Sequence, residues 1–217
     1  MIKKDLIRVV GLDLDGTQYQ STPETDLRVR TKIAEKLLDK NPDLKNIENA
    51  RQFFEQRYAI LHSGTKVLEE AGYQYSSKVM DECLATANVI DLIKKDEKLA
   101  EIIERIHGEY LTFLLTASPE ELARAKLSAI GINPASFDYK LYSDTPEAGN
   151  KNDGTAFKYL LNLTQILPEK HVYIGDRKSS DIIPAKNLGM KTIAVWSDIP
   201  EADLSIDHIY KLEEILL

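Results

Sequence analysis

Two carboxylates stand two residues apart at Asp13 and Asp15, at the start of the segment DLDGT. The apolar run at residues 6–14 is typical of a buried strand, and side chains two apart on an extended chain point to the same side. Both carboxylates would then enter one crevice at the edge of a parallel sheet, where ligands usually bind. A turn that ends the strand is the simpler alternative. A calcium loop of the EF-hand type is excluded, because the required acidic positions do not fall in step.

A second pair of carboxylates, Asp176 and Asp181, follows another apolar run at residues 171–175. If the two runs are neighbouring strands, Asp176 comes within reach of Asp13. Crowded carboxylates are unfavourable unless a cation neutralises them, and a few hard oxygen ligands with open positions suit Mg²⁺. The alternative is a turn at Asp176 and a helix cap at Ser180 or Asp181.

Two further residues have the chemistry to hold an anion. Thr116 ends an apolar run and precedes a predicted helix, whose free N–H groups and dipole favour negative charge. Lys151 lies in a polar loop between a strand and a helix, where it would offset the charge of Asp13 and of a bound phosphate. Both also have ordinary explanations, because β-branched residues commonly end strands and loop lysines are commonly solvated.

The elements that must position these residues alternate between strands and helices. Apolar runs predict strands at residues 6–14, 110–116, 139–143, 171–175 and 191–196, with a last strand and helix from Ile206. Helical patterns separate them, and the segment Ser118-Pro119-Glu120-Glu121 has the signature of a helix capping box. This alternation predicts an α/β fold with a Rossmann-like parallel sheet covered on both faces.

One stretch, residues 19–95, interrupts the alternation. Its apolar spacing and its turn signals predict only helices, at residues 22–40, 47–61, 64–71 and 77–93. We therefore predict two domains: an α/β core formed by residues 1–18 and 96–217, and an all-helical insert formed by residues 19–95.

The composition limits the class of protein and its partners. The 217 residues include 28 Lys and Arg against 35 Asp and Glu, and this net charge of −7 argues against a nucleic acid polymer or an anionic membrane as a partner. Cys83 is the single cysteine, so neither an internal disulfide nor a structural zinc site is expected. Without a predicted leader peptide or membrane span, we expect a cytoplasmic protein, whose oligomeric state the sequence leaves open.

In chain order, the residues with this chemistry read DxDGT at 13–17, Thr116, Lys151 and GDxxxxD at 175–181. This ordered set resembles the haloacid dehalogenase (HAD) superfamily. The resemblance covers nearly the whole chain, because one group of that superfamily carries its cap domain between the first motif and the motif threonine. It implies a HAD-like core with residues 19–95 as a helical cap.

The resemblance also implies a role for each matching residue. Asp13 would be the nucleophile that forms an aspartyl-phosphate, and Asp15 would protonate the leaving group and then accept a proton from water. Thr116 and Lys151 would hold phosphoryl oxygens. Mg²⁺ would be bound by Asp13, the backbone carbonyl of Asp15, and Asp176.

Asp181 would then orient a metal-bound water or Lys151. The chain departs from the family pattern at Ala117, where Asn or Gly is frequent, and at Asn152, where proline usually follows the lysine. Neither change removes an essential group, so the resemblance still implies an active enzyme.

The insert resembles the pyrimidine 5′-nucleotidase-like branch at residues 52–59 and 63–68, as do residues 19–22 next to the first motif. This resemblance implies a nucleoside monophosphate as a candidate substrate, with insert aromatics stacking on its base. Helical aromatics in a small insert also commonly form its core. As a cap, the insert would close over the crevice and exclude water.

The expected function is a Mg²⁺-dependent phosphatase that acts on a small phosphorylated metabolite. Two alternatives stay open: a sugar phosphomutase with the same Asp13 chemistry, and a catalytically silent module that binds phosphate or a partner. Asp15 favours phosphoryl chemistry over dehalogenation, and the presence of both carboxylates counts against the silent module.

Overall fold

The computed structural model describes residues 2–217 and contains a parallel six-stranded sheet with the strand order β3-β2-β1-β4-β5-β6. The strands are β1 (Val9–Leu12), β2 (Leu111–Leu115), β3 (Tyr139–Leu141), β4 (His171–Gly175), β5 (Lys191–Val195) and β6 (Leu204–Ile206). The prediction of an α/β fold with a parallel sheet is confirmed.

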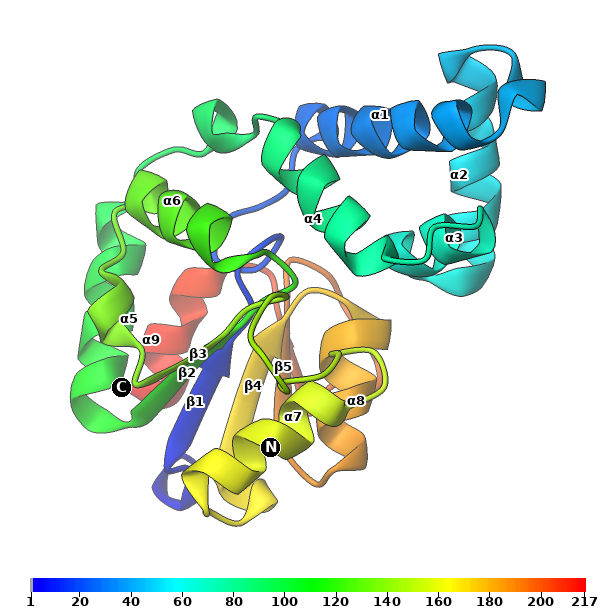
Figure 1. The fold of residues 1–217 in the computed structure, drawn as a ribbon. Helices are drawn as coiled ribbons and strands as arrows, with labels where there is room; N and C mark the ends of the chain where they lie inside the picture. The colour runs from blue at the N-terminus through cyan, green and yellow to red at the C-terminus, as the bar shows by residue number, and fades with distance from the viewer. Residues whose placement is uncertain (1) are drawn as a thin grey trace. The chain divides into compact units, whose positions relative to one another are not determined.

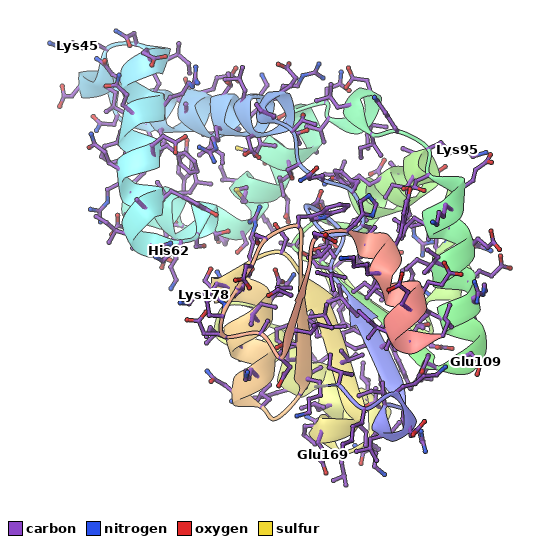
Figure 2. The ribbon with its side chains drawn as sticks, turned by 180° about the vertical axis from the view of Figure 1, so that it is seen from behind. Lys45, His62, Lys95, Glu109, Glu169 and Lys178 are labelled. Carbon is purple, nitrogen blue, oxygen red and sulfur yellow. The ribbon has the colours of Figure 1, made fainter. Side chains whose placement is uncertain are left out.

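Strand β1 lies in the middle of the sheet because all of its residues are small or apolar and all are buried. Its Leu12 aligns with Leu114 of β2 on one side and with Ile174 of β4 on the other. The carboxyl ends of these three strands therefore meet at one edge. Figure 2 labels Glu169 and Lys178, which mark the two ends of β4 and so the direction in which the strands run.

Helices cover both faces of the sheet (Figure 1). Three helices pack with Val10 and Leu12 on one face: α5 (Glu97–Glu109), α6 (Glu120–Ile130) and α9 (Leu212–Leu216). Two pack with Val9 and Phe113 on the other: α7 (Thr155–Thr164) and α8 (Ile183–Asn187). The alternation of side chains along β1 supplies both cores.

The described chain divides into two compact units, one up to Gln20 together with Ile93–Leu217, and the other Ser21–Leu92. The second unit contains the helices α1 (Pro23–Lys40), α2 (Ile47–Leu61), α3 (Gly64–Glu70) and α4 (Ser76–Thr86). Its bounds lie slightly inside the 19–95 predicted for the insert. Thr22 and Asn46 cap α1 and α2 by accepting hydrogen bonds from backbone N–H groups.

This helical unit has an apolar core of its own. The core contains the buried side chains of Ile33, Ala34, Leu37, Ala50, Phe54, Val67, Leu68 and Cys83. Figure 2 labels Lys45 and His62, which mark the two ends of α2. Among the helices of residues 2–217, none is long and apolar enough to cross a membrane.

Two predicted helices differ from those observed. The helix predicted at 77–93 ends at Thr86, because Asn88 adopts a left-handed conformation (φ 51°) that stops it, and a separate 3₁₀ turn follows at Ile90–Leu92. The helix predicted from Asp181 begins instead as a π-helical turn, Lys178–Ile182, and continues as α8. Pro184 lacks the N–H that a regular α-helix would need there.

Candidate active site

Lys151 links two carboxylates at the carboxyl end of the sheet. Its Nζ lies 2.9 Å from Asp13 Oδ1 and 2.5 Å from Asp181 Oδ1, and all three side chains are buried. Asp13 directly follows β1, and its N–H donates to the carbonyl oxygen of Ile174 in β4. Sheet pairing therefore fixes Asp13, and two buried ion pairs fix Lys151 beside it.

The loop that carries Lys151 is held by its own polar side chains. Asn150 N–H donates to Thr155 Oγ1 at 2.7 Å, and Asn152 N–H donates to Asn150 Oδ1 at 2.8 Å. Thr155 N–H donates to Asp153 Oδ1 at 2.9 Å, at the start of α7. The polar run around Lys151 thus forms a defined turn that directs the lysine inward, and the solvated alternative for this residue does not apply.

Asp176 joins the same cluster from the end of β4. One carboxylate oxygen from each of Asp13, Asp176 and Asp181 lies within 4.8 Å of the others. Thr17 Oγ1 donates to Asp176 Oδ1 at 3.2 Å. Gly16 has a φ of +77°, and a Cβ at this position would lie 2.5 Å from Asp176 Oδ2, so only glycine lets the DLDGT loop approach this closely.

Burial dominates the protonation of these carboxyls. It raises the pKa of Asp13 to about 7, with the Lys151 ammonium opposing the rise and the carboxylates of Asp181 and Asp176 adding to it. Burial likewise raises the pKa of Asp176 to about 6. Burial alone would lower the pKa of Lys151, but the two carboxylates that it contacts raise it. The lysine is therefore firmly protonated.

This donor set fits a divalent cation. Three clustered carboxylates exceed the charge of the buried Lys151, and the remaining negative charge is what a hard cation would neutralise. Asp181 is the least suited to be a direct ligand, because Oδ1 pairs with Lys151 and Oδ2 accepts a hydrogen bond from Arg177 N–H at 2.9 Å. Asp13 and Asp176 are the better candidates, and their role as metal ligands stays a prediction.

Asp15 has a separate set of partners. Lys126 Nζ lies 2.5 Å from Asp15 Oδ1, and Ser118 Oγ donates to Asp15 Oδ2 at 2.7 Å. The Tyr19 hydroxyl also donates to Oδ1. Burial would raise the pKa of Asp15, but the Lys126 ammonium and the hydrogen bonds from Lys126, Tyr19 and Ser118 outweigh it and lower the pKa to about 2.

Lys126 has no motif in the sequence that points to Asp15, and Ser118 differs from its prediction as a helix cap. Ser118 was expected to cap a helix, but α6 starts at Glu120, and the Glu120 N–H donates to Asp144 Oδ1 instead. The serine hydroxyl is thereby available for Asp15. The sequence does contain one indication that Lys126 has an acidic partner. It stands beside Leu127 on the buried side of a helix, where an unpaired lysine is rare.

Thr116 lies one residue beyond β2 and is buried. The pairing of Leu12 with Leu114 brings this end of β2 alongside the DLDGT loop. Thr116 Oγ1 accepts a hydrogen bond from Ser118 N–H at 3.1 Å. The prediction that a helix follows Thr116 directly is wrong, because α6 starts four residues later, at Glu120.

The aromatic side chains of the helical unit mostly belong to its core. Phe54 is buried, and Phe53, Tyr58 and Tyr73 pack against the same apolar cluster. Tyr75 is the exposed exception, at 71%. Core packing therefore accounts for most of the aromatics considered for base stacking.

Comparison with known proteins gives a family and a relative. A family model described as haloacid dehalogenase-like hydrolase matches residues 7–189. A glyceraldehyde 3-phosphate phosphatase of Methanocaldococcus jannaschii is 36% identical over 95 residues. That match covers 42% of this chain and 41% of the relative, so it spans less than half of either protein.

Solved structures resemble the chain over nearly its full length. A HAD phosphatase from Thermococcus onnurineus matches with a TM-score of 0.66 and 19% identity, over 97% of this chain and 98% of its own. A 2-haloacid dehalogenase from Pseudomonas syringae pv. Tomato DC3000 matches with a TM-score of 0.57 and 20% identity, over 97% and 98%. At these identities the likeness establishes the fold, and the side chains of the site have to decide between chemistries.

Proposed function

The chain belongs to the haloacid dehalogenase-like hydrolase family, and we propose that it is a Mg²⁺-dependent phosphatase acting on a small phosphomonoester. The buried arrangement of Asp13, Lys151 and Asp181 next to Asp176 is the observation that carries the proposal. It combines a candidate nucleophile, a fixed cation for phosphoryl oxygens and a donor set for a metal ion in one place.

In the first half-reaction, an oxygen of Asp13 forms a bond to phosphorus, and the bond between phosphorus and the leaving oxygen breaks. The leaving oxygen keeps the electron pair and takes a proton from Asp15. Because the pKa of Asp15 is lowered to about 2 in the free protein, this proton enters the site with the singly protonated phosphomonoester and passes to the leaving oxygen through Asp15. Lys151 holds phosphoryl oxygens near Asp13, with Thr116 as a second contact. The product alcohol departs and the phosphoryl group stays on Asp13.

In the second half-reaction, water attacks the phosphorus and the bond to Asp13 breaks. Asp15, now ionised, takes the proton of the attacking water and is ready for the next cycle. Asp13 and Asp176, with the backbone carbonyl of Asp15, would hold Mg²⁺, which supplies charge stabilisation for the transferring phosphoryl group when bound. Asp181 keeps Lys151 in place.

The presence of Asp15 supports phosphate ester chemistry over dehalogenation, because alcohol leaving groups need a proton and halide leaving groups do not. A sugar phosphomutase remains the second candidate, since it would use the same two carboxylates. The partial relative suggests phosphorylated trioses as substrates to test, and the nucleotidase-like segments suggest nucleoside monophosphates.

The test compares wild type with Asp13→Asn. Both proteins are incubated with Mg²⁺ and a panel of triose phosphates, sugar phosphates, phosphoglycolate and nucleoside monophosphates, and released phosphate is measured. We expect Asp13→Asn to lower kcat by on the order of 10³-fold or more, because the amide cannot act as the nucleophile. Circular dichroism controls for folding.

Each outcome selects one function. Phosphate release by wild type alone supports the phosphatase, and the preferred compound defines its substrate class. Conversion of one sugar phosphate to an isomer without net phosphate release selects the mutase. Equal release by Asp13→Asn, or saturable binding of phosphomonoesters without turnover, contradicts the proposal.

A further inference from the structure

Lys126 is a buried cation that the proposed mechanism does not use. It projects from α6 and is only 2% exposed. Its Nζ contacts Asp15 Oδ1 at 2.5 Å and donates to Ser118 Oγ at 2.8 Å, while Ser118 Oγ donates to the second oxygen of Asp15 at 2.7 Å. Lys126 thus contacts one oxygen of the Asp15 carboxylate, and Ser118, which is itself held by Lys126, contacts the other.

Burying the charge of a lysine costs desolvation free energy unless the ammonium group contacts an opposite charge or hydrogen-bond acceptors. A leucine at this position would extend the apolar face formed by Ala123, Leu127 and Ile130 of α6. The charge reaches past that face to Asp15, on the loop after β1. The contact therefore links the helix that follows β2 to a carboxylate that the nucleophile loop carries.

We propose that Lys126 is a positioning residue for Asp15: with Ser118 it fixes the carboxyl group that transfers the proton to the leaving oxygen. The inference rests on the proposed function, because it gives Lys126 a part in that phosphoryl transfer. Lys126 forms no bond to the substrate. It restricts the Asp15 side chain, which is 30% exposed, to one orientation.

The proposal makes a prediction that depends on the leaving group. Alkyl phosphates release an alkoxide that needs the proton from Asp15, whereas p-nitrophenyl phosphate releases a stable phenolate that leaves without it. Misplacing Asp15 therefore slows the first half-reaction for alkyl phosphates only. The ratio kcat/KM reports this step, because it excludes the later hydrolysis of the aspartyl-phosphate that both substrates share.

The experiment measures kcat/KM for the best alkyl phosphate of the panel and for p-nitrophenyl phosphate, in wild type and Lys126→Met. We expect a loss of about 10²-fold for the alkyl phosphate and of less than about 5-fold for p-nitrophenyl phosphate. Lys126→Arg, which keeps the charge, should recover part of the alkyl phosphate activity. Arg124→Met is the matched control, because it removes an exposed ion pair with Glu120 from the same helix.

Ser118→Ala keeps the test valid if Lys126→Met does not fold. It removes the hydrogen bond to Asp15 Oδ2 and leaves the ion pair, so the same selective loss should appear at smaller size. Thermal unfolding identifies which variants are folded.

Equal losses on both substrates in folded variants, or no loss on either, would overturn the positioning role and leave the phosphatase intact. If wild type releases no phosphate from any compound, the proposed function fails first and this role falls with it. An active wild type with an inactive Asp13→Asn separates the two cases.

Discussion

The raised pKa values of Asp13 and Asp176 make the active site a source of instability at neutral pH. Folding raises these pKa values to about 7 and about 6, mainly by burial, above their ordinary value of 3.8. A carboxyl with a raised pKa contributes stability that is complete below its unfolded pKa and is lost as the pH rises through its folded pKa. The relevant window therefore runs from about pH 4 to about pH 7.

We expect Asp13→Asn to be more stable than wild type in metal-free buffer at about pH 8, by at least about 1 kcal/mol, and by much less at about pH 5. Urea denaturation with EDTA at the two pH values measures this. Taking the difference between the two proteins cancels other groups, such as His171, whose pKa burial lowers. Excess Mg²⁺ should shrink the gap by stabilising wild type, and a gap that does not change with pH would contradict the assignment.

At this scale, the sequence predicted the residues whose motif is local. The motifs single out Asp13, Asp15, Lys151, Asp176 and Asp181. The structure brings all of these except Asp15 into one cluster, in which Asp176 is partly exposed and the other three are buried. Lys126 was missed because its partner is far away along the chain and a single lysine in a helical pattern carries no motif. Its contact with Asp15 depends on how the fold places α6 against the loop after β1, which the spacing of residues in the sequence does not show.

Among the glycines of the described residues, Gly11 in β1 has the least room for a side chain. An added Cβ at Gly11 would lie 1.9 Å from the ring of Phe113, which stacks on Tyr173 with ring centroids 5.7 Å apart. Tyr173 in turn meets Phe157 of α7 edge to face. The glycine therefore makes room for an aromatic layer between the sheet and α7.

We expect Gly11→Ala to destabilise the protein by about 3 kcal/mol, because the rings cannot move aside in a close-packed core. Phe113→Leu in the same chain should recover part of this loss by opening space. Chemical denaturation of the two single variants and the double variant measures the coupling. Additive losses would show that Gly11 and Phe113 do not compete for the same volume.

Element types were predicted well where the apolar pattern is uninterrupted, as in α2 and β4. They were predicted less well where one residue changes the backbone. The left-handed Asn88 ends a helix that the pattern would extend, and Pro184 converts the start of another into a π-helical turn. The capping-box prediction at Ser118 fails for a similar reason. The acceptor for the Glu120 N–H is Asp144, which is distant in sequence and so absent from the local pattern.

For the whole molecule, the main feature is the presence of separate apolar cores in the two units. The break in alternation predicts an insert at residues 19–95, and the second compact unit is Ser21–Leu92. The sequence did not predict which insert residues meet a substrate, because most of the insert's aromatics serve its own core. Its role as a cap remains a prediction.

We expect Leu68→Ala to cost about 2–5 kcal/mol in the helical unit, because the side chain is fully buried there. Amide hydrogen exchange should then become faster across Ser21–Leu92 and stay unchanged in β1 and β4. Leu114→Ala in β2 is the matched control. It should make amide exchange faster in β1 and β4 and leave Ser21–Leu92 unchanged. Faster exchange throughout the chain in both variants would mean that the units unfold as one.

The central place of β1 has a consequence for the order of synthesis. β1 is made first, yet its neighbours β2 and β4 leave the ribosome about 100 and about 160 residues later. The helical unit lies between them and is continuous in sequence, so it can finish folding while β1 still waits for both partners. During that interval the nascent chain carries a wholly apolar strand with two open edges, which is the kind of surface that makes an incompletely folded chain prone to aggregation.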